Sequence, residues 1–193
     1  HFGRIFYNQA NMSAAGIPVL TIVHGSATAG GAYMPGVSDF VVMVRDRARA
    51  FLAGPPLLKA ATGEIATEEE LGGALMHASV SGLAEYLAED DADAIRALRE
   101  HLRRLAWHRH ESSLPAATEP RFAADELLSI MPVDGRKPVD MREVIARLCD
   151  DSDFMEFQPT YGPATVCAHA SIGGFAVGVL SNNGPLDPAG SSK

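Results

Sequence analysis

Cysteine is scarce in this 193-residue sequence, in which only Cys149 and Cys167 occur and no C-x-x-C pair is present. Neither a zinc ribbon nor a disulfide framework is indicated, and reduced thiols are the default. No apolar run approaches the roughly 20 residues that a membrane-spanning helix needs, and no signal-like segment is visible. We therefore expect no membrane association, and a location in the cytoplasm or, in a eukaryote, in the mitochondrial matrix.

Several motifs that indicate a particular chemistry are also absent. There is no G-x-x-x-x-G-K-[ST] phosphate loop, no G-x-G-x-x-G dinucleotide motif and no G-x-S-x-G nucleophile elbow. His108 and His110 are two residues apart, a spacing that would send them to different sides of a helix, so we expect no bound metal. These absences remove the common nucleotide-binding, serine-nucleophile and metal-dependent classes.

Positive charge is the smaller share of the charged residues, with 16 Lys and Arg against 24 Asp and Glu and a formal net charge of −8. This balance disfavours a phosphate-backbone partner, and nucleic-acid binding is not expected. A local basic patch for a nucleotide-like ligand stays compatible with the composition.

Small residues are concentrated in one stretch, 25–33, which reads Gly-Ser-Ala-Thr-Ala-Gly-Gly-Ala-Tyr. The flanking runs 17–23 and 40–44 are short and rich in β-branched residues, which predicts buried strands. Gly30 and Gly31 begin a short helical segment whose first N–H groups have no partner within the helix. Because glycine lets a ligand approach the backbone, this turn suits an oxyanion. Simple packing of a strand–helix junction is the alternative.

The rest of the sequence predicts an α/β protein. Thr67 and Glu70 have the capping-box spacing of a helix start, and Gly173-Gly174 suits a tight hairpin turn. Helices are expected at 1–12, 57–62, 67–72, 92–107, 123–129 and from 140 onward, and strands at 17–23, 40–44, 50–53, 165–171 and 175–181. His77 follows in a looser segment, where a single histidine is more often a hydrogen-bonded core residue than a ligand.

The composition changes between 111 and 138, where four prolines and an Asp-Gly pair break any long periodicity. We expect residues 1–110 to form the end of one domain, 111–138 a linker, and 139–193 the start of a second domain. Both ends of the sequence suggest a piece of a longer polypeptide.

Four motifs, in order and spacing, resemble the carboxyltransferase β subunit of biotin-dependent acyl-CoA carboxylases, above all the methylcrotonoyl-CoA and geranyl-CoA enzymes. They are His1-Phe-Gly-Arg-Ile-Phe-Tyr-Asn-Gln-Ala10, Thr28-Ala-Gly-Gly-Ala-Tyr33, Gly54-Pro-Pro-Leu-Leu-Lys-Ala-Ala-Thr-Gly-Glu64, and Leu71-Gly-Gly73 with His77 and Ser81-Gly82. Asp134-Gly-Arg-Lys-Pro138 through Phe157 resembles the start of the second carboxyltransferase domain. The resemblance implies a crotonase-like α/β fold with the end of one such domain and the start of another.

The resemblance also implies a reaction. An acyl-CoA, a branched enoyl-CoA such as 3-methylcrotonoyl-CoA or geranyl-CoA, would lose a proton and take a carboxyl group from carboxybiotin, with its enolate oxygen held by backbone donors. The implied donors are the N–H groups of Gly30 and Gly31, with Ala29 beside them. The implied substrate contacts are Thr28, Ala32, Tyr33, Gly54, Lys59 and His77. This account explains why the turn has no nucleophile of its own.

The implied cofactor is biotin carried on a partner, the biotin carboxylase/biotin carboxyl carrier α subunit, around a hexameric core of β subunits. A second oxyanion hole for biotin would lie beyond Lys193. Leu75 and Ser79 stand where family members often carry an Asp and a basic residue, and Gly184-Pro-Leu-Asp-Pro188 differs from the methylcrotonoyl enzymes. The alternatives are a propionyl-CoA or acetyl-CoA carboxyltransferase, a crotonase-type hydratase or isomerase with Glu64 as the nearest acid/base candidate, and a non-catalytic assembly subunit.

Overall fold

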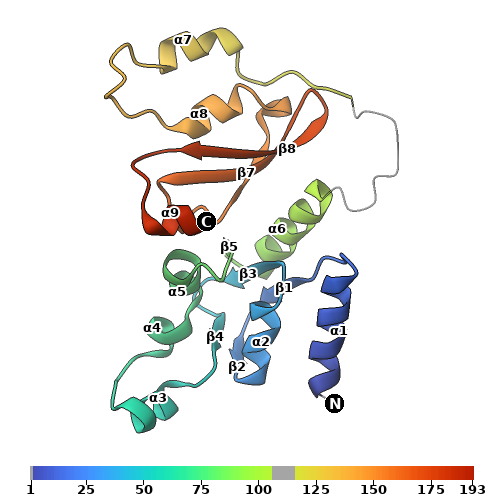
Figure 1. Cartoon of the computed structure of the whole chain (residues 1–193), viewed down its shortest axis with the longest axis vertical. Coiled ribbons are helices and arrows are strands. Elements are labelled where there is room, and N and C mark those ends of the chain that lie inside the picture. Colours follow the sequence, from blue (N-terminus) through green and yellow to red (C-terminus); the bar gives the residue numbers. More distant parts are fainter. Residues whose placement is uncertain (1, 106–115) are drawn as a thin grey trace. The chain divides into compact units, whose positions relative to one another are not determined.

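The chain folds into two compact units in the computed structural model, His1–Glu100 (unit 1) and His101–Lys193 (unit 2). The structure describes residues 2–105 and 116–193. Figure 1 traces unit 1 from blue to green and unit 2 toward red. Each unit has its own sheet, so each is described separately.

Unit 1 is organised around a parallel sheet. Its strands are β1 (Leu20–Val23), β3 (Phe40–Val44) and β5 (Tyr86–Ala88), in the order β1-β3-β5. All five residues of the central strand β3 are buried, as a continuous apolar run in a parallel strand predicts. A smaller parallel pair joins β2 (Ser26–Thr28) to β4 (Arg49–Phe51). These two strands support the small-residue stretch.

The helices of unit 1 begin and end where local sequence signals place them. Pro55 opens α3, and Gly63 ends it in the left-handed conformation at φ +80°. Thr67 and Glu70 form the reciprocal capping box at the start of α4. The helices are α1 (Phe2–Ala14), α2 (Gly30–Gly36), α3 (Pro55–Thr62), α4 (Glu68–Gly72), α5 (Ala74–Met76), the π-helical turn η1 (His77–Ser81) and α6 (Asp91–Arg104). The last turn of α6 falls within unit 2.

Unit 2 is built on an antiparallel sheet, β6-β7-β8, made by β6 (Phe154–Phe157), β7 (Thr165–Ile172) and β8 (Phe175–Asn182). Gly173 and Gly174 join β7 to β8 with φ values of +60° and +82°, which two central turn residues of a type I′ hairpin require. Its helices are η2 (Ala124–Glu126), α7 (Leu127–Ile130), α8 (Met141–Ala146), η3 (Asp150–Ser152) and α9 (Pro188–Ser192). The core packs one face of α8 and Cys149 against β7.

Most expected elements are present, with shifted ends. The third expected strand is β4, the helix expected at 92–107 runs from Asp91 to Arg104, and Gly173-Gly174 makes the expected hairpin. The segment expected to be loose after α4 is helical, and three short strands, β2, β5 and β6, were not expected. Trp107, His108 and His110 lie outside the described residues.

The second half of the expected linker packs within unit 2. Arg147, at the end of α8, donates to Glu126 in η2 at 2.6 Å and to Glu143 at 2.8 Å. Its guanidinium also lies over the Phe122 ring, 4.9 Å from the centroid. These contacts attach the segment around 122–130 to α8, while the division between the units falls at 100/101.

Candidate functional site

The turn before α2 is held in a strained conformation. Ala29 has φ +51° and ψ −118°, values that match the first central residue of a type II′ turn and that glycine adopts more readily. Such a backbone costs about 1–3 kcal/mol for a residue with a side chain. The Ala29 N–H donates to the Phe51 carbonyl at 3.1 Å, and the Ala29 carbonyl accepts from the Ala32 N–H at 3.0 Å. Both peptide groups of Ala29 are therefore committed to fixing the turn.

The next two N–H groups are open. Gly30 and Gly31 are the first two residues of α2, so their N–H groups have no acceptor within the helix. No other acceptor for them is recorded in the residues that the structure describes. Buried or half-buried N–H groups nearly always find a partner, so adjacent donors without one favour an external acceptor.

Only one of the two glycines has a packing reason to be glycine. A Cβ on Gly30 would lie 3.0 Å from Cε1 of Phe2, tighter than ordinary side-chain contacts. A Cβ on Gly31 would meet nothing within 4 Å, and its backbone is helical. Neither crowding nor conformation explains glycine at position 31, whereas close approach of a ligand to its N–H does.

Gly31 lines a hollow of about 460 Å³ between α1, β1 and α2. The lining combines apolar residues with the polar side chains of Gln9, Thr21, His24 and Ser26. Among the described residues, no carboxylate lines this hollow. A reaction here that needs a carboxylate as general acid or base lacks its group.

The other predicted site residues are spread over unit 1. Thr28 pairs with Phe51 in the β2–β4 ladder, and Tyr33 on α2 stacks edge-on against Phe6 of α1. Gly54 is the residue before α3, and Lys59 lies in the exposed last turn of that helix. Ala32 donates to the Ala29 carbonyl. Thr28, Ala32 and Tyr33 thus flank the turn directly, while Gly54 and Lys59 lie on the segment that follows β4.

His77 is buried, with 9% of its surface exposed. Its Nε2 lies 2.6 Å from the Ala50 carbonyl oxygen, and its Nδ1 lies 2.7 Å from Oγ of Ser81. Both ring nitrogens are thus engaged inside the protein. This is the arrangement of a core histidine, and its partner Ala50 belongs to β4, the strand that holds Ala29.

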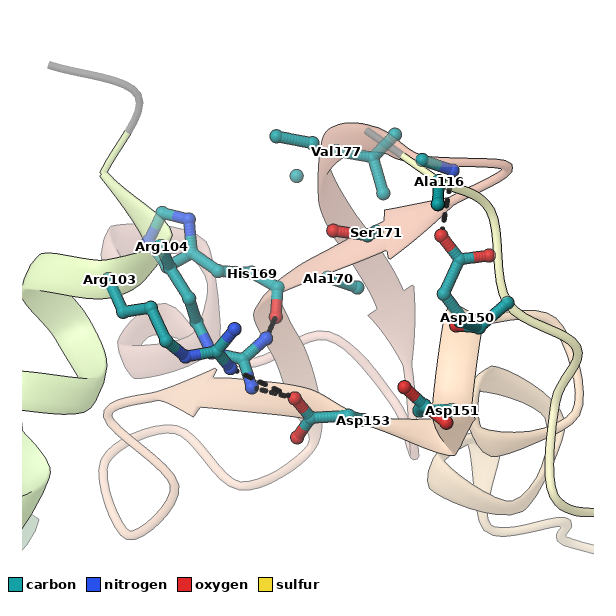
Figure 2. Close-up of a pocket in the computed structure, with 14 residues that line it drawn as sticks. Arg103, Arg104, Ala116, Asp150, Asp151, Asp153, His169, Ala170, Ser171 and Val177 are labelled. Atoms are coloured by element: carbon teal, nitrogen blue, oxygen red, sulfur yellow. Dashed lines mark hydrogen bonds and ion pairs between the residues drawn. The ribbon is translucent and has the colours of Figure 1, made fainter. Parts of the chain in front are cut away.

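A second hollow, of about 410 Å³, lies in unit 2. Figure 2 shows Arg103 and Arg104 reaching Asp153, at 3.2 and 2.6 Å, and Arg104 also donates to the His169 carbonyl. The hollow's two guanidiniums face three carboxylates, since Asp150 and Asp151 line it as well. Its charges are neutralised internally, so it does not have the character of an anion site.

Other reactive groups are not arranged for catalysis. Both cysteines are free thiols, and burial raises the pKa of Cys149, which keeps it protonated and unreactive. Within 2–105 and 116–193 no three His, Cys, Asp or Glu side chains gather as a metal site. In the same ranges, no helix combines the length and apolar character of a membrane span.

The fold and the turn define a class: a crotonase-like α/β protein with a backbone donor pair and no nucleophile beside it. Comparison with known proteins identifies the family. The carboxyl transferase domain family matches residues 1–193, and the chain belongs to this family. The predicted fold class is confirmed, because solved carboxyltransferase structures superpose on this chain.

Three known proteins illustrate the relationship. The mitochondrial methylcrotonoyl-CoA carboxylase beta chain of Dictyostelium discoideum is 49% identical over 187 residues, covering 96% of this chain and 32% of the relative. The geranyl-CoA carboxylase beta subunit of P. aeruginosa is 51% identical with a TM-score of 0.51, covering 99% of this chain and 36% of the other. The transcarboxylase 12S hexamer core is 34% identical with a TM-score of 0.87, covering 98% and 38%. The chain thus spans about a third of the length of the relatives it matches.

Proposed function

We propose that this chain provides the acyl-CoA side of a biotin-dependent carboxyltransferase. The observation that carries the proposal is the open N–H pair of Gly30 and Gly31, with Gly31 free of any packing or conformational reason to be glycine. A thioester carbonyl that becomes an enolate oxygen needs such donors, and each is worth about 3–4 kcal/mol in comparable sites. Membership of the carboxyl transferase family supports the assignment.

The chain's residues act on the substrate, and carboxybiotin, carried by a partner, supplies the carboxyl group. As the acidic C–H bond of the acyl-CoA breaks, the electron pair moves into the enolate, and its negative charge collects on the thioester oxygen. Gly30 and Gly31 donate to that oxygen and lower the barrier most when the charge is fully formed. Carboxybiotin would supply the other reactants: its N–CO₂ bond would break, the freed ureido nitrogen would accept the proton lost by the substrate, and the substrate carbon would bond to the released carboxyl carbon.

The proposed substrate is a branched enoyl-CoA. In such a substrate the reacting carbon is γ, and conjugation still carries the negative charge to the thioester oxygen, so the same donor pair serves. The names of the Dictyostelium and P. aeruginosa relatives, a methylcrotonoyl-CoA and a geranyl-CoA carboxylase, support this class. Thr28, Ala32, Tyr33, Gly54 and Lys59 remain the predicted contacts of the acyl-CoA.

The proposed partners follow from the same relatives. Biotin would arrive on an α subunit, and β subunits would assemble as a hexamer, as the transcarboxylase core does. A location in the cytoplasm or the mitochondrial matrix accompanies the proposal, since the Dictyostelium relative is mitochondrial.

A crotonase-type hydratase is the competing activity on the same fold. It would need an acid/base group beside the turn. Among the described residues, the hollow that Gly31 lines has no carboxylate, and its one imidazole, that of His24, is mostly exposed to solvent. Glu64, the candidate from the sequence, lies on an exposed segment after α3, where its N–H donates to Oγ1 of Thr62 at 3.2 Å. These observations favour carboxyl transfer.

The test is an assay of the full-length β subunit together with its α subunit. We expect ATP- and bicarbonate-dependent carboxylation of 3-methylcrotonoyl-CoA or geranyl-CoA, with propionyl-CoA a poorer substrate. Hydration of an enoyl-CoA in the absence of biotin and ATP, without carboxylation, would overturn the proposal.

A further inference from the structure

The strand β4 connects two parts of unit 1 that the sequence separates. Its Phe51 carbonyl accepts the Ala29 N–H at 3.1 Å, and the Arg49 N–H donates to the Gly25 carbonyl at 3.0 Å. The β2–β4 ladder runs between these two bonds, with Thr28 opposite Phe51. A displacement of β4 would therefore displace the turn that carries Gly30 and Gly31.

The Ala50 carbonyl points to the other side of this strand, because successive carbonyls of a strand alternate in direction. That side carries α4, and a Cβ on Gly72 would collide with the Ala50 carbonyl oxygen. The oxygen is therefore enclosed by α4 and the π-helical turn η1. The His77 imidazole meets it there, with 2.6 Å between Nε2 and the oxygen.

The tautomer of His77 follows from its partners. A carbonyl can only accept, so Nε2 carries the hydrogen, and in the neutral ring Nδ1 accepts from the Ser81 hydroxyl at 2.7 Å. The π-helical turn sets the spacing that brings His77 and Ser81 together. Such turns occur often at functional sites. The pair is no catalytic dyad, because Nε2 is committed to a backbone carbonyl.

We propose that His77, oriented by Ser81, is a positioning residue that holds β4 and thereby sets the place of the Gly30–Gly31 donors. This inference rests on the proposed function and deepens it, since it gives a buried side chain a part in enolate stabilisation without contact with the substrate. Displacing a catalytic group by about 1 Å can lower a rate by about 10²-fold. The resemblance suggested a substrate contact for His77, and the two roles have different kinetic signatures.

The experiment uses the full-length β subunit assembled with its α subunit and three variants. His77→Phe keeps an aromatic ring and removes both hydrogen bonds, and His77→Gln keeps a donor that can reach the Ala50 carbonyl. Ser81→Ala removes the hydroxyl that orients the ring, together with its longer contacts to the Leu83 N–H at 3.3 Å and the His77 carbonyl at 3.4 Å. We expect kcat for carboxylation to fall about 10- to 100-fold in His77→Phe and by less in Ser81→Ala, with KM for the acyl-CoA within about twofold of wild type. His77→Gln should recover part of the loss.

Size-exclusion chromatography of each variant checks assembly, and Ser81→Ala decides the question if His77→Phe does not fold. A kcat within twofold of wild type in Ser81→Ala and in every assembled His77 variant would overturn the inference, and so would a loss that appears only as a raised KM. A wild-type complex that carboxylates no acyl-CoA contradicts the proposed function itself, and the inference fails with it.

Discussion

Two glycine pairs in this chain present adjacent backbone N–H groups, and the two pairs differ in the acceptors of those N–H groups. In unit 2, the N–H groups of Gly173 and Gly174 donate to Oδ1 and Oδ2 of Asp150, at 2.9 and 2.7 Å. In unit 1, the N–H groups of Gly30 and Gly31 have no acceptor among the residues that the structure describes. The Gly173–Gly174 pair shows what such donors bind when the chain supplies an anion itself.

The difference separates a structural turn from a site. The Asp150 carboxylate joins the β7–β8 hairpin to η3, so the Gly173–Gly174 pair contributes to the stability of unit 2. The Gly30–Gly31 pair is held by strained Ala29 and by β4, yet no acceptor in the described chain binds its N–H groups. A strained turn whose donors remain open is typical of a preorganised binding site.

The largest expected effect comes from removing one open donor. Gly31→Pro deletes the N–H at the second position of α2, where proline fits a first helical turn, and should lower kcat/KM for carboxylation by about 10²–10³-fold. Gly31→Ala is the matched comparison, because it keeps the N–H, and its Cβ meets no protein atom within 4 Å and can crowd only the ligand, so we expect a smaller loss than in Gly31→Pro. Steady-state kinetics of the assembled complex measures both. Equal losses in the two variants would mean that the added bulk, and not the donor, matters.

Loss of the hydrogen bonds to Gly173 and Gly174 should lower the stability of unit 2 and leave the carboxylation reaction unchanged. Asp150→Asn replaces a carboxylate that accepts two N–H bonds with an amide that can accept only one of them well, which should cost about 1.5–3 kcal/mol. Urea unfolding of the full-length subunit measures the loss. Asp151→Asn is the control, since Asp151 has φ +54° and asparagine tolerates that conformation. An Asp150→Asn subunit as stable as wild type would show that the hydrogen bonds to Gly173 and Gly174 do not stabilise unit 2.

Acid should also separate the two regions. Residues 29–31 carry no ionisable side chain, whereas unit 2 holds buried His101 with its ring 5.7 Å from that of His169. Burial, with a smaller effect of His169, lowers the pKa of His101 to about 4. The unfolded chain takes up this proton near pH 6.5 and the folded chain does not, so stability is complete above pH 6.5 and falls toward pH 4.

At pH 5 the free energy of unfolding should be lower by about 2 kcal/mol than above pH 6.5. Unfolding of the full-length subunit between pH 4.5 and 7.5 measures it, and His101→Phe should flatten the profile in this range. A profile that keeps its full slope in His101→Phe would assign the acid sensitivity to other groups.

The smallest effect is expected at Ala29. Ala29→Gly relieves the strain of φ +51° and adds backbone freedom to the unfolded chain. These two changes oppose each other and leave a net gain in stability of about 0–2 kcal/mol. Thermal unfolding should move by a few degrees at most, with a modest fall in kcat as the turn loosens. A strong loss of stability in this variant would show that Ala29 is not strained.

The sequence predicts the parts of this molecule that depend on local chemistry. The apolar run of β3, the capping box of Thr67 and Glu70, and the Gly173-Gly174 hairpin were each predicted and each is observed. The strands β2, β5 and β6 were missed, because three or four residues with little alternation carry no periodic signal. They form because longer elements place a partner strand beside them.

The same limit applies to the site. Gly30 and Gly31 were found from a glycine pair at a helix start, which is a local pattern. The contact between His77 and the Ala50 carbonyl spans 27 residues, and no spacing in the sequence indicates it. A buried histidine followed four residues later by serine is a signal only once β4 is known to lie against it.

The vibrational frequency of the substrate carbonyl tests the central claim most directly. Difference infrared spectroscopy of 3-methylcrotonoyl-CoA, labelled with ¹³C at the thioester carbonyl and bound to the full-length β subunit, reports hydrogen bonds to that oxygen. The account predicts a lower C=O frequency on the wild-type subunit than in water, and a smaller shift in Gly31→Pro than in Gly31→Ala. The same frequency in all three proteins would show that the Gly30–Gly31 pair does not hold the thioester oxygen.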